Sequence, residues 1–188
     1  QENYRAAFVD HVQHAVKSVV MCGDDEGNLA VLRALDASAA AHTVVYATQD
    51  AASLGDLNGA AFVHIESESE SAQSGAEHFT LHVPAGLLCE QERMVSVTLA
   101  VPGIHNARNA SAAIIAAALL GVDIEKAAEA ATSFLGAVRR FQVRGTVSQV
   151  TVVDDYAHHP TEISALLDAA RRKYPQSAIR VIFQPHLF

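Results

Sequence analysis

The segment VDDYAHHPTE at residues 153–162 places two aspartates, a tyrosine, two histidines and a proline beside one another. It follows a β-branched run that is typical of a buried strand. Ligands of open α/β sheets bind beyond the carboxyl ends of the strands, so we expect Asp154, Asp155 and Tyr156 to face a binding crevice. Successive strand residues point to opposite faces, so only one of the two aspartates reaches a given ligand. The alternative is that the pair caps the turn and the following helix.

His158 and His159 suggest a metal site, but their spacing argues against one. Consecutive side chains diverge, and Pro160 holds His159 in an extended conformation. Two such neighbours do not converge on one ion at the ~2 Å that a metal–nitrogen bond requires. We therefore expect the histidines to hydrogen-bond a substrate or to act across a domain hinge, and we assign no metal ligand in the chain.

Two asparagines follow VPGIH and bracket the first turn of an apolar, helix-forming stretch. Asn106 either caps this helix or contacts a ligand. Asn109 lies among apolar residues, where an amide needs a partner, and an amide can both donate to and accept from an adenine edge. His105 either stacks on a ligand or closes a loop.

The periodicity of the remaining sequence predicts an α/β protein. Polar residues at 66–77, ESESESAQSGAE, indicate a solvated surface loop. A link and then a hairpin are expected over 136–155. The other predicted strands are 18–22, 43–47, 60–65, 78–83, 94–101 and 179–185, and the predicted helices are 2–17, 29–36, 105–121, 123–135 and 160–175.

A domain boundary is expected near residues 136–138, which divides the chain into domains 1–137 and 138–188. Strand, helix and strand in the last forty or so residues predict a parallel α/β unit. Arg139 and Arg140 stand at this junction, where they either keep the surface soluble or clamp a phosphate across an interdomain cleft.

Composition excludes several classes of function. A net charge of −8 and a pI near 5.6 argue against binding nucleic acid or an anionic membrane surface. No apolar run approaches the roughly 20 residues that span a bilayer. Cys22 and Cys89 have no CxxC partner and are expected to be free, buried thiols of a cytosolic protein. The chain starts without methionine and stops at FQPHLF, which suggests an excised piece.

Four motifs occur in one order: GIHNARN, GAVRRF, VDDYAHHPTE and FQPH. Together they resemble the Mur ligases of peptidoglycan synthesis, and the resemblance runs from ENYRAAF to the last residue. It implies a mixed central-domain sheet with helices, followed by the start of a Rossmann-like C-terminal domain. It also implies a three-domain ligase in which ATP and Mg²⁺ activate the carboxylate of UDP-N-acetylmuramate as an acyl phosphate for attack by L-alanine.

The resemblance assigns roles by motif. His105, Asn106 and Asn109 would form the adenine pocket. Asp155 would approach the ribose, and Tyr156 would lie at the hinge beside the nucleotide. The remaining assignments are Arg140 near the phosphates, and His158 or His159, together with His186, toward the acyl and amino-acid substrates.

The chain departs from the family pattern in several places. Gln142 follows RRF where an acidic residue is common, and Leu187 replaces an arginine. A phosphate loop of the form GxxxxGK[ST] does not occur, since none of the three lysines follows a glycine. The chain therefore matches the later part of the central ATPase domain and the opening of the C-terminal domain, and we expect it to be inactive alone.

Two other functions remain open from the sequence. One is the related ligase that reattaches recycled murein tripeptide, although FQPH favours the alanine-adding reaction. The other is a non-catalytic module that binds a nucleotide or a sugar.

Overall fold

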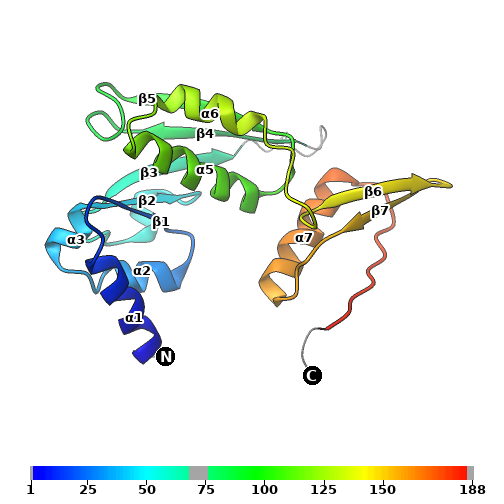
Figure 1. Ribbon diagram of the computed structural model, residues 1–188, viewed down its shortest axis with the longest axis horizontal. Helices are drawn as coiled ribbons and strands as arrows, with labels where there is room; N and C mark the ends of the chain where they lie inside the picture. Colours follow the sequence, from blue (N-terminus) through cyan, green and yellow to red (C-terminus); the bar gives the residue numbers. More distant parts are fainter. Residues whose placement is uncertain (1, 68–75, 186–188) are drawn as a thin grey trace.

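A mixed five-stranded sheet forms the centre of the larger part of the chain (Figure 1). The computed structural model describes residues 2–67 and 76–185. The strand order is β1-β2-β3-β4-β5; the first three strands are parallel, and β4 and β5 continue the sheet antiparallel. The predicted mixed α/β fold is confirmed. The strands are β1 Val19–Cys22, β2 Thr43–Ala47, β3 Ala61–Ser67, β4 Glu77–Val83 and β5 Arg93–Leu99.

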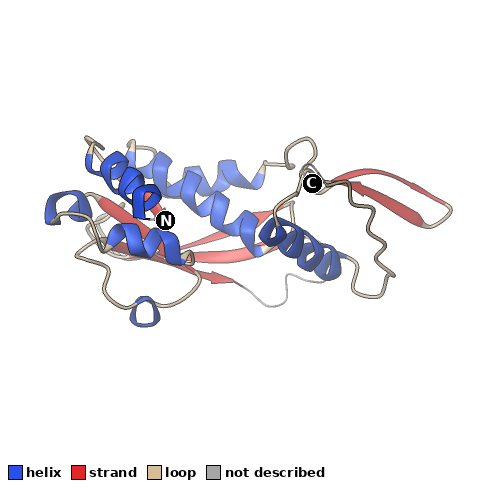
Figure 2. Cartoon of the chain, turned by 90° about the horizontal axis from the view of Figure 1, so that it is seen from below, coloured by secondary structure: helices blue, strands red, loops and turns tan. Residues whose placement is uncertain are grey.

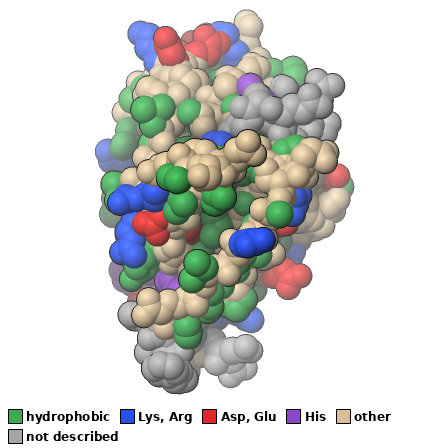
Figure 3. Space-filling model, turned by 90° about the vertical axis from the view of Figure 1, so that its right-hand side faces the viewer, with side chains coloured by type: hydrophobic (Ala, Val, Ile, Leu, Met, Phe, Trp, Pro, Cys, Tyr) green, Lys and Arg blue, Asp and Glu red, His purple; other side chains and the backbone are tan. Residues whose placement is uncertain are grey.

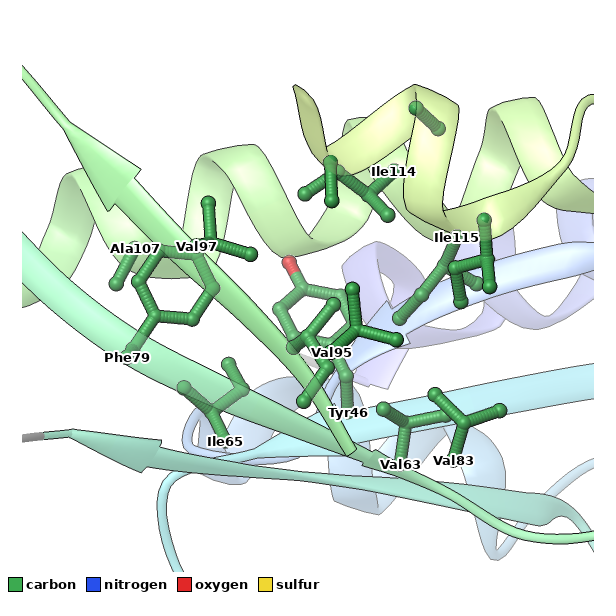
Figure 4. Close-up of a cluster of buried hydrophobic side chains, with 14 of the residues drawn as sticks. Tyr46, Val63, Ile65, Phe79, Val83, Val95, Val97, Ala107, Ile114 and Ile115 are labelled. Carbon is green, nitrogen blue, oxygen red and sulfur yellow. The ribbon is translucent and has the colours of Figure 1, made fainter. Parts of the chain in front are cut away.

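Helices cover both faces of this sheet (Figures 1 and 2). On one face, α5 (Ile104–Leu119) and α6 (Ile124–Thr132) bury a cluster that includes Tyr46, Phe79 and Ile114 (Figure 4). On the other face, α1 (Glu2–Gln13) and α2 (Glu26–Leu32) pack with the short α3 (Ala37–Ala41) and α4 (Ala51–Leu54). All five residues of β2 are buried, as expected for a parallel strand covered on both sides.

The ends of several helices follow from their capping residues. Asp123 accepts the backbone N–H groups of Glu125 and Lys126 at 3.1 Å, which confirms its predicted role at the start of α6. The helices α3 and α4 were not predicted, because five and four residues are too few to show a helical period. Asp36 and Asp50 cap them, so short helices were signalled only by these aspartates.

The rest of the chain forms a smaller unit beside the sheet, at the right of Figure 1. Strands β6 (Gln142–Val147) and β7 (Val150–Asp154) form the predicted hairpin. Its two turn residues, Ser148 and Gln149, have φ of 49° and 66°, as a tight hairpin turn requires. Helix α7 (Pro160–Lys173) follows, with Pro160 in its first turn as predicted.

The strand predicted at 179–185 is wrong. The chain there is not helix or strand, and in the part of the chain that the structure describes β7 pairs only with β6. A strand needs a neighbour for its backbone hydrogen bonds, and no strand within residues 2–67 and 76–185 pairs with this segment. The side chain of Ile182 is fully exposed, so the expected parallel strand–helix–strand unit is not formed.

Apolar side chains are consequently exposed on the smaller unit. Figure 3 views this end of the molecule and shows hydrophobic side chains among charged ones. Exposed apolar residues of the hairpin and the final segment are Val143, Val147, Val150, Val152, Val181, Ile182 and Phe183. None of the helices within residues 2–67 and 76–185 is long and apolar enough to cross a membrane.

The predicted polar loop at 66–77 is wrong at both of its ends. Glu66 and Ser67 belong to β3, and Glu77 begins β4 with a fully buried side chain. Residues 68–75 lie outside the described part of the chain. Cys22 and Cys89 are both free, as predicted, but each is only partly buried.

Candidate functional site

A cavity of about 740 Å³ lies between α5, the linker that follows α6, and the start of α7. It brings together residues that are up to 67 positions apart in the chain, from Leu99 to Leu166. Of the eight described residues to which the resemblance assigns roles, five line it: His105, Asn106, Asn109, Arg140 and Asp155. The apolar part of its wall includes Leu99, Val101, Ala113, Phe134 and Leu166.

One wall of the cavity is the first turn of α5. The Asn106 amide donates from Nδ2 to the carbonyl oxygen of Pro102 at 2.7 Å, so it does not cap the helix in the usual sense of accepting a backbone N–H. The N-cap residue is Gly103, and no side chain caps the helix there. Asn109 is exposed to the cavity rather than enclosed among apolar residues, and its side chain makes no hydrogen bond within the described residues. Its amide is therefore available to a ligand.

His105 lies half-buried beside Asn106. Burial lowers the pKa of its imidazole, and this effect exceeds the opposing attraction of the Asp155 and Glu77 carboxylates. The ring is therefore neutral at pH 7, which suits stacking on a heteroaromatic ring and removes the cost of desolvating a charge.

The second wall is the linker. Arg139 and Phe141 have left-handed φ angles of 60° and 48°, which are unusual for side chains of this size. Asp155 holds this conformation: its Oδ2 accepts the N–H of Phe141 at 2.7 Å, and its Oδ1 accepts the N–H of Ala157 at 2.7 Å. Asp155 therefore caps the turn after β7, which was the alternative to a role in ligand binding, and it also lines the cavity.

Arg140 supplies positive charge to the cavity. Its Nη1 lies 3.8 Å from Oε1 of Glu162, and both side chains are partly exposed. Such a pair contributes little to stability, so the guanidinium can reorient toward an anion with little loss. Asp154 points elsewhere and lies 3.8 Å from Nε of Arg139, in line with the expectation that only one of the two aspartates faces a given site.

Tyr156, His158 and His159 do not line the cavity. The Tyr156 ring lies under the guanidinium of Arg139, 5.0 Å from it, on the linker. His159 is extended, as Pro160 dictates, and caps α7 by accepting the N–H of Thr161. His158 pairs with Glu162. The last predicted residue, His186, lies outside the described part of the chain.

The sequence reasoning missed a charged network that joins α5 to the residues after β1. Arg108 lines the cavity, and its Nε donates to Oδ2 of Asp24 at 2.6 Å. The Asp24 side chain is only 4% exposed and also accepts the N–H and the hydroxyl of Thr48. Asp24 follows β1 in CGDDEG. The rule that ligands bind beyond the carboxyl ends of strands, which we applied to the end of β7, therefore also indicated Asp24.

Comparisons with known proteins agree with the motifs. Residues 139–186 match the family model described as Mur ligase, glutamate ligase domain. Over all 188 residues, the chain is 79% identical to the UDP-N-acetylmuramate–L-alanine ligase of Bifidobacterium adolescentis and 63% identical to that of Bifidobacterium longum. The chain belongs to the Mur ligase family.

A solved structure supports the fold of this Mur ligase chain. The UDP-N-acetylmuramate-alanine ligase of Thermotoga maritima is 28% identical, with a TM-score of 0.55 over 85% of this chain and 36% of that one. The chain spans 36% and 37% of the length of the two Bifidobacterium relatives. It therefore corresponds to little more than a third of a Mur ligase of their size.

One departure from the Mur ligase pattern has a structural explanation. Gln142 replaces the acidic residue that is common after RRF, and its Oε1 accepts the Arg139 N–H at 3.1 Å and an Arg144 N–H at 3.2 Å. Both contacts need only an acceptor oxygen, which an amide supplies as a carboxylate does. The substitution thus keeps the linker hydrogen bond and removes one negative charge beside Arg139 and Arg144.

The cavity of this Mur ligase chain fits part of a nucleotide. Its apolar wall, an unbonded amide and a neutral imidazole suit a purine, whose edge needs both a donor and an acceptor. Within the described residues, no cluster of three histidine, cysteine or acidic side chains could hold a metal ion.

Proposed function

We propose that this chain forms the adenine and ribose side of the ATP site in a UDP-N-acetylmuramate–L-alanine ligase. The observation that carries the proposal is that one cavity gathers His105, Asn106, Asn109, Arg140 and Asp155 from two units of the chain. Asn109 would pair with the adenine edge, and the neutral His105 would stack on the ring. We also propose that residues 1–137 and 138–188 belong to different domains of the whole enzyme.

The ribose and phosphates would meet the linker wall. A carboxylate has about four acceptor positions, so Asp155 could accept a ribose hydroxyl while it keeps both backbone N–H groups. Arg140 would turn from Glu162 toward the phosphates. His158 and His159, which do not line this cavity, would act toward the acyl and amino-acid substrates, and we propose the same role for His186.

In the whole enzyme, ATP with Mg²⁺ would activate the carboxylate of UDP-N-acetylmuramate as an acyl phosphate, which the amine of L-alanine attacks with release of phosphate. The main phosphate and metal contacts would come from outside this chain, because GxxxxGK[ST] does not occur in it. The names of the relatives that match over the full length favour L-alanine over a recycled peptide as the acceptor.

Titration of the 188-residue chain tests this proposal. We expect adenosine, AMP and magnesium-ATP to bind with similar, millimolar affinity, because the chain contacts the nucleoside more than the triphosphate. In NMR spectra, the amides of residues 103–109 should shift on adding adenosine. Alanine-dependent phosphate release should stay at the buffer level.

Two results would contradict the proposal. Adenosine that leaves the signals of residues 103–109 unchanged would remove the nucleoside from the cavity. Micromolar binding of magnesium-ATP without matching adenosine binding would show that the chain has a phosphate site of its own.

A further inference from the structure

A fully buried glutamate connects the two units of the chain. The Glu77 side chain, at the start of β4, has no exposed surface. Its Oε2 accepts the N–H of Gly103 at 2.8 Å, and its Oε1 accepts from the Ser67 hydroxyl at 3.3 Å and from Nη2 of Arg172 at 3.1 Å. Glutamate is seldom buried unless it is paired, so its place here calls for a role.

The backbone that Glu77 holds is the start of the α5 wall. Gly103 is the N-cap residue of α5 and lies two residues before His105. A Cβ atom at Gly103 would lie 2.6 Å from Cε1 of His105 and 3.2 Å from Cβ of Ala169 in α7. Ala169 is 1% exposed, so α7 packs directly against the point where the α5 wall begins.

The cation of the pair comes from the other wall. Arg172 lies in the last turn of α7, and the first half of this helix lines the cavity with Thr161, Glu162, Ala165 and Leu166. Through Glu77, Arg172 is therefore tied to the residue that begins the opposite wall. The adjacent Arg171 differs, since among the described residues it donates to carbonyl oxygens that follow its own helix, those of Pro175 and Ser177.

We propose that the Glu77–Arg172 ion pair sets the spacing of the two cavity walls that accepts an adenine nucleoside, and that both are positioning residues for nucleotide binding. The inference rests on the proposed function for the identity of the ligand. Neither residue lines the cavity, so neither touches the nucleoside. Without the pair, α7 would move relative to α5, and the chain would spend less time in the arrangement that binds.

The variants must separate positioning from stability. Removing one partner of a buried pair leaves an uncompensated charge and destabilises the fold, whereas replacing both by groups of similar shape is often nearly neutral. The decisive variant is therefore the double replacement Glu77→Gln with Arg172→Met, which keeps an acceptor for the Gly103 N–H. The matched control is Arg171→Ala, and Arg172→Lys is the conservative rescue.

The wall spacing is measured without a ligand. Spin labels at exposed sites on α6 and α7, through Glu129→Cys and Ser164→Cys, report the distance between the units in a background in which Cys22 and Cys89 are alanine. We expect the distance distribution to broaden in the double variant, to stay unchanged in Arg171→Ala and to be largely restored in Arg172→Lys. A double variant with the distribution of the control would overturn the proposal.

Adenosine affinity is the second readout. If the binding arrangement falls to about a tenth of the population, the apparent affinity falls about ten-fold. We expect this loss in the double variant, and an affinity close to the wild-type chain in Arg171→Ala and Arg172→Lys. A broadened distribution with unchanged adenosine affinity would also overturn the proposal. If the wild-type chain binds no adenosine, the proposed function fails, while the distance distributions still decide whether the ion pair sets the spacing.

Discussion

The carboxylate of Asp155 accepts the backbone N–H of Phe141 at 2.7 Å and so fixes a linker residue whose φ of 48° is unfavourable for a phenylalanine. The same carboxylate lines the candidate nucleotide cavity. Because the Asp155 side chain both bonds the linker and lines the cavity, the conformation of the linker and the shape of the site are coupled. Its neighbour Asp154 has no such double role.

Asp155→Asn should therefore destabilise the chain, while Asp154→Asn should not. Loss of charge-assisted bonds to two backbone N–H groups is expected to lower the free energy of unfolding by about 1–3 kcal/mol. Asp154 forms only a partly exposed pair, so its replacement should change that free energy by about 0–1 kcal/mol. Urea unfolding at pH 7 measures both, and equal losses would contradict the assignment.

The two asparagines of α5 should behave in opposite ways. Asn109→Ala should leave the unfolding free energy nearly unchanged but weaken adenosine binding by about 1–3 kcal/mol, because a buried ligand group loses its partner. Asn106→Ala should lose stability, because its amide bonds to the carbonyl of Pro102. Calorimetry measures the adenosine affinity of each variant, and thermal unfolding of the same samples measures its stability. A destabilised Asn109→Ala with wild-type affinity would indicate a packing role instead.

Gly103→Ala should be far more damaging than Gly86→Ala. Both glycines have left-handed φ, of 108° and 79°, so each alanine carries backbone strain of about 1 kcal/mol or more. Only at Gly103 would the added methyl group also collide with His105, whereas nothing lies within 4 Å at Gly86. Adenosine binding should be lost in the first variant and kept in the second. Equal melting temperatures for the two would contradict the crowding at Gly103.

Asp24 should contribute to stability at neutral pH and lose that contribution in acid. Burial acts to raise the pKa of Asp24, but hydrogen bonds from Thr48 and Arg108 outweigh it and hold the pKa below its ordinary value of 3.8. The unfolded chain thus takes up the proton first, and stability falls as the pH drops below about 5 and through the folded pKa. Urea unfolding should give Asp24→Asn a lower free energy of unfolding than the wild type at pH 7, and a smaller fall of that free energy as the pH drops. Asp168→Asn, at an exposed site, should show the same pH dependence as the wild type.

His105 should titrate below its ordinary pKa of 6.5, because burial disfavours the imidazolium. Since the unfolded state binds the proton more readily, this residue favours folding above pH 6.5, and its contribution declines as the pH falls below that value. The Cε1 proton resonance gives the midpoint directly, with His105→Gln used to assign it. A midpoint at or above 6.5 would show that the Asp155 and Glu77 carboxylates dominate over burial.

Local sequence signals determined most of the elements. Period and β-branched composition indicated every strand of the five-stranded sheet, because burial on a pleated face requires that pattern. Asp123 and Pro160 marked helix starts, because capping depends on neighbours in the chain. The motifs also named five of the residues that line the cavity.

Tertiary structure decided what depends on partners distant in sequence. Ile179–Pro185 has the composition of a strand, yet a strand exists only where another strand offers its hydrogen-bonding groups. Glu77 ended a run of polar residues that reads as a solvated loop, but the N–H of Gly103 and the guanidinium of Arg172, 26 and 95 positions away, compensate its burial. Asp24 and Arg108 meet across 84 positions for the same reason. A polar side chain is buried or exposed according to the partners that the fold brings to it, and a local pattern carries no information about them.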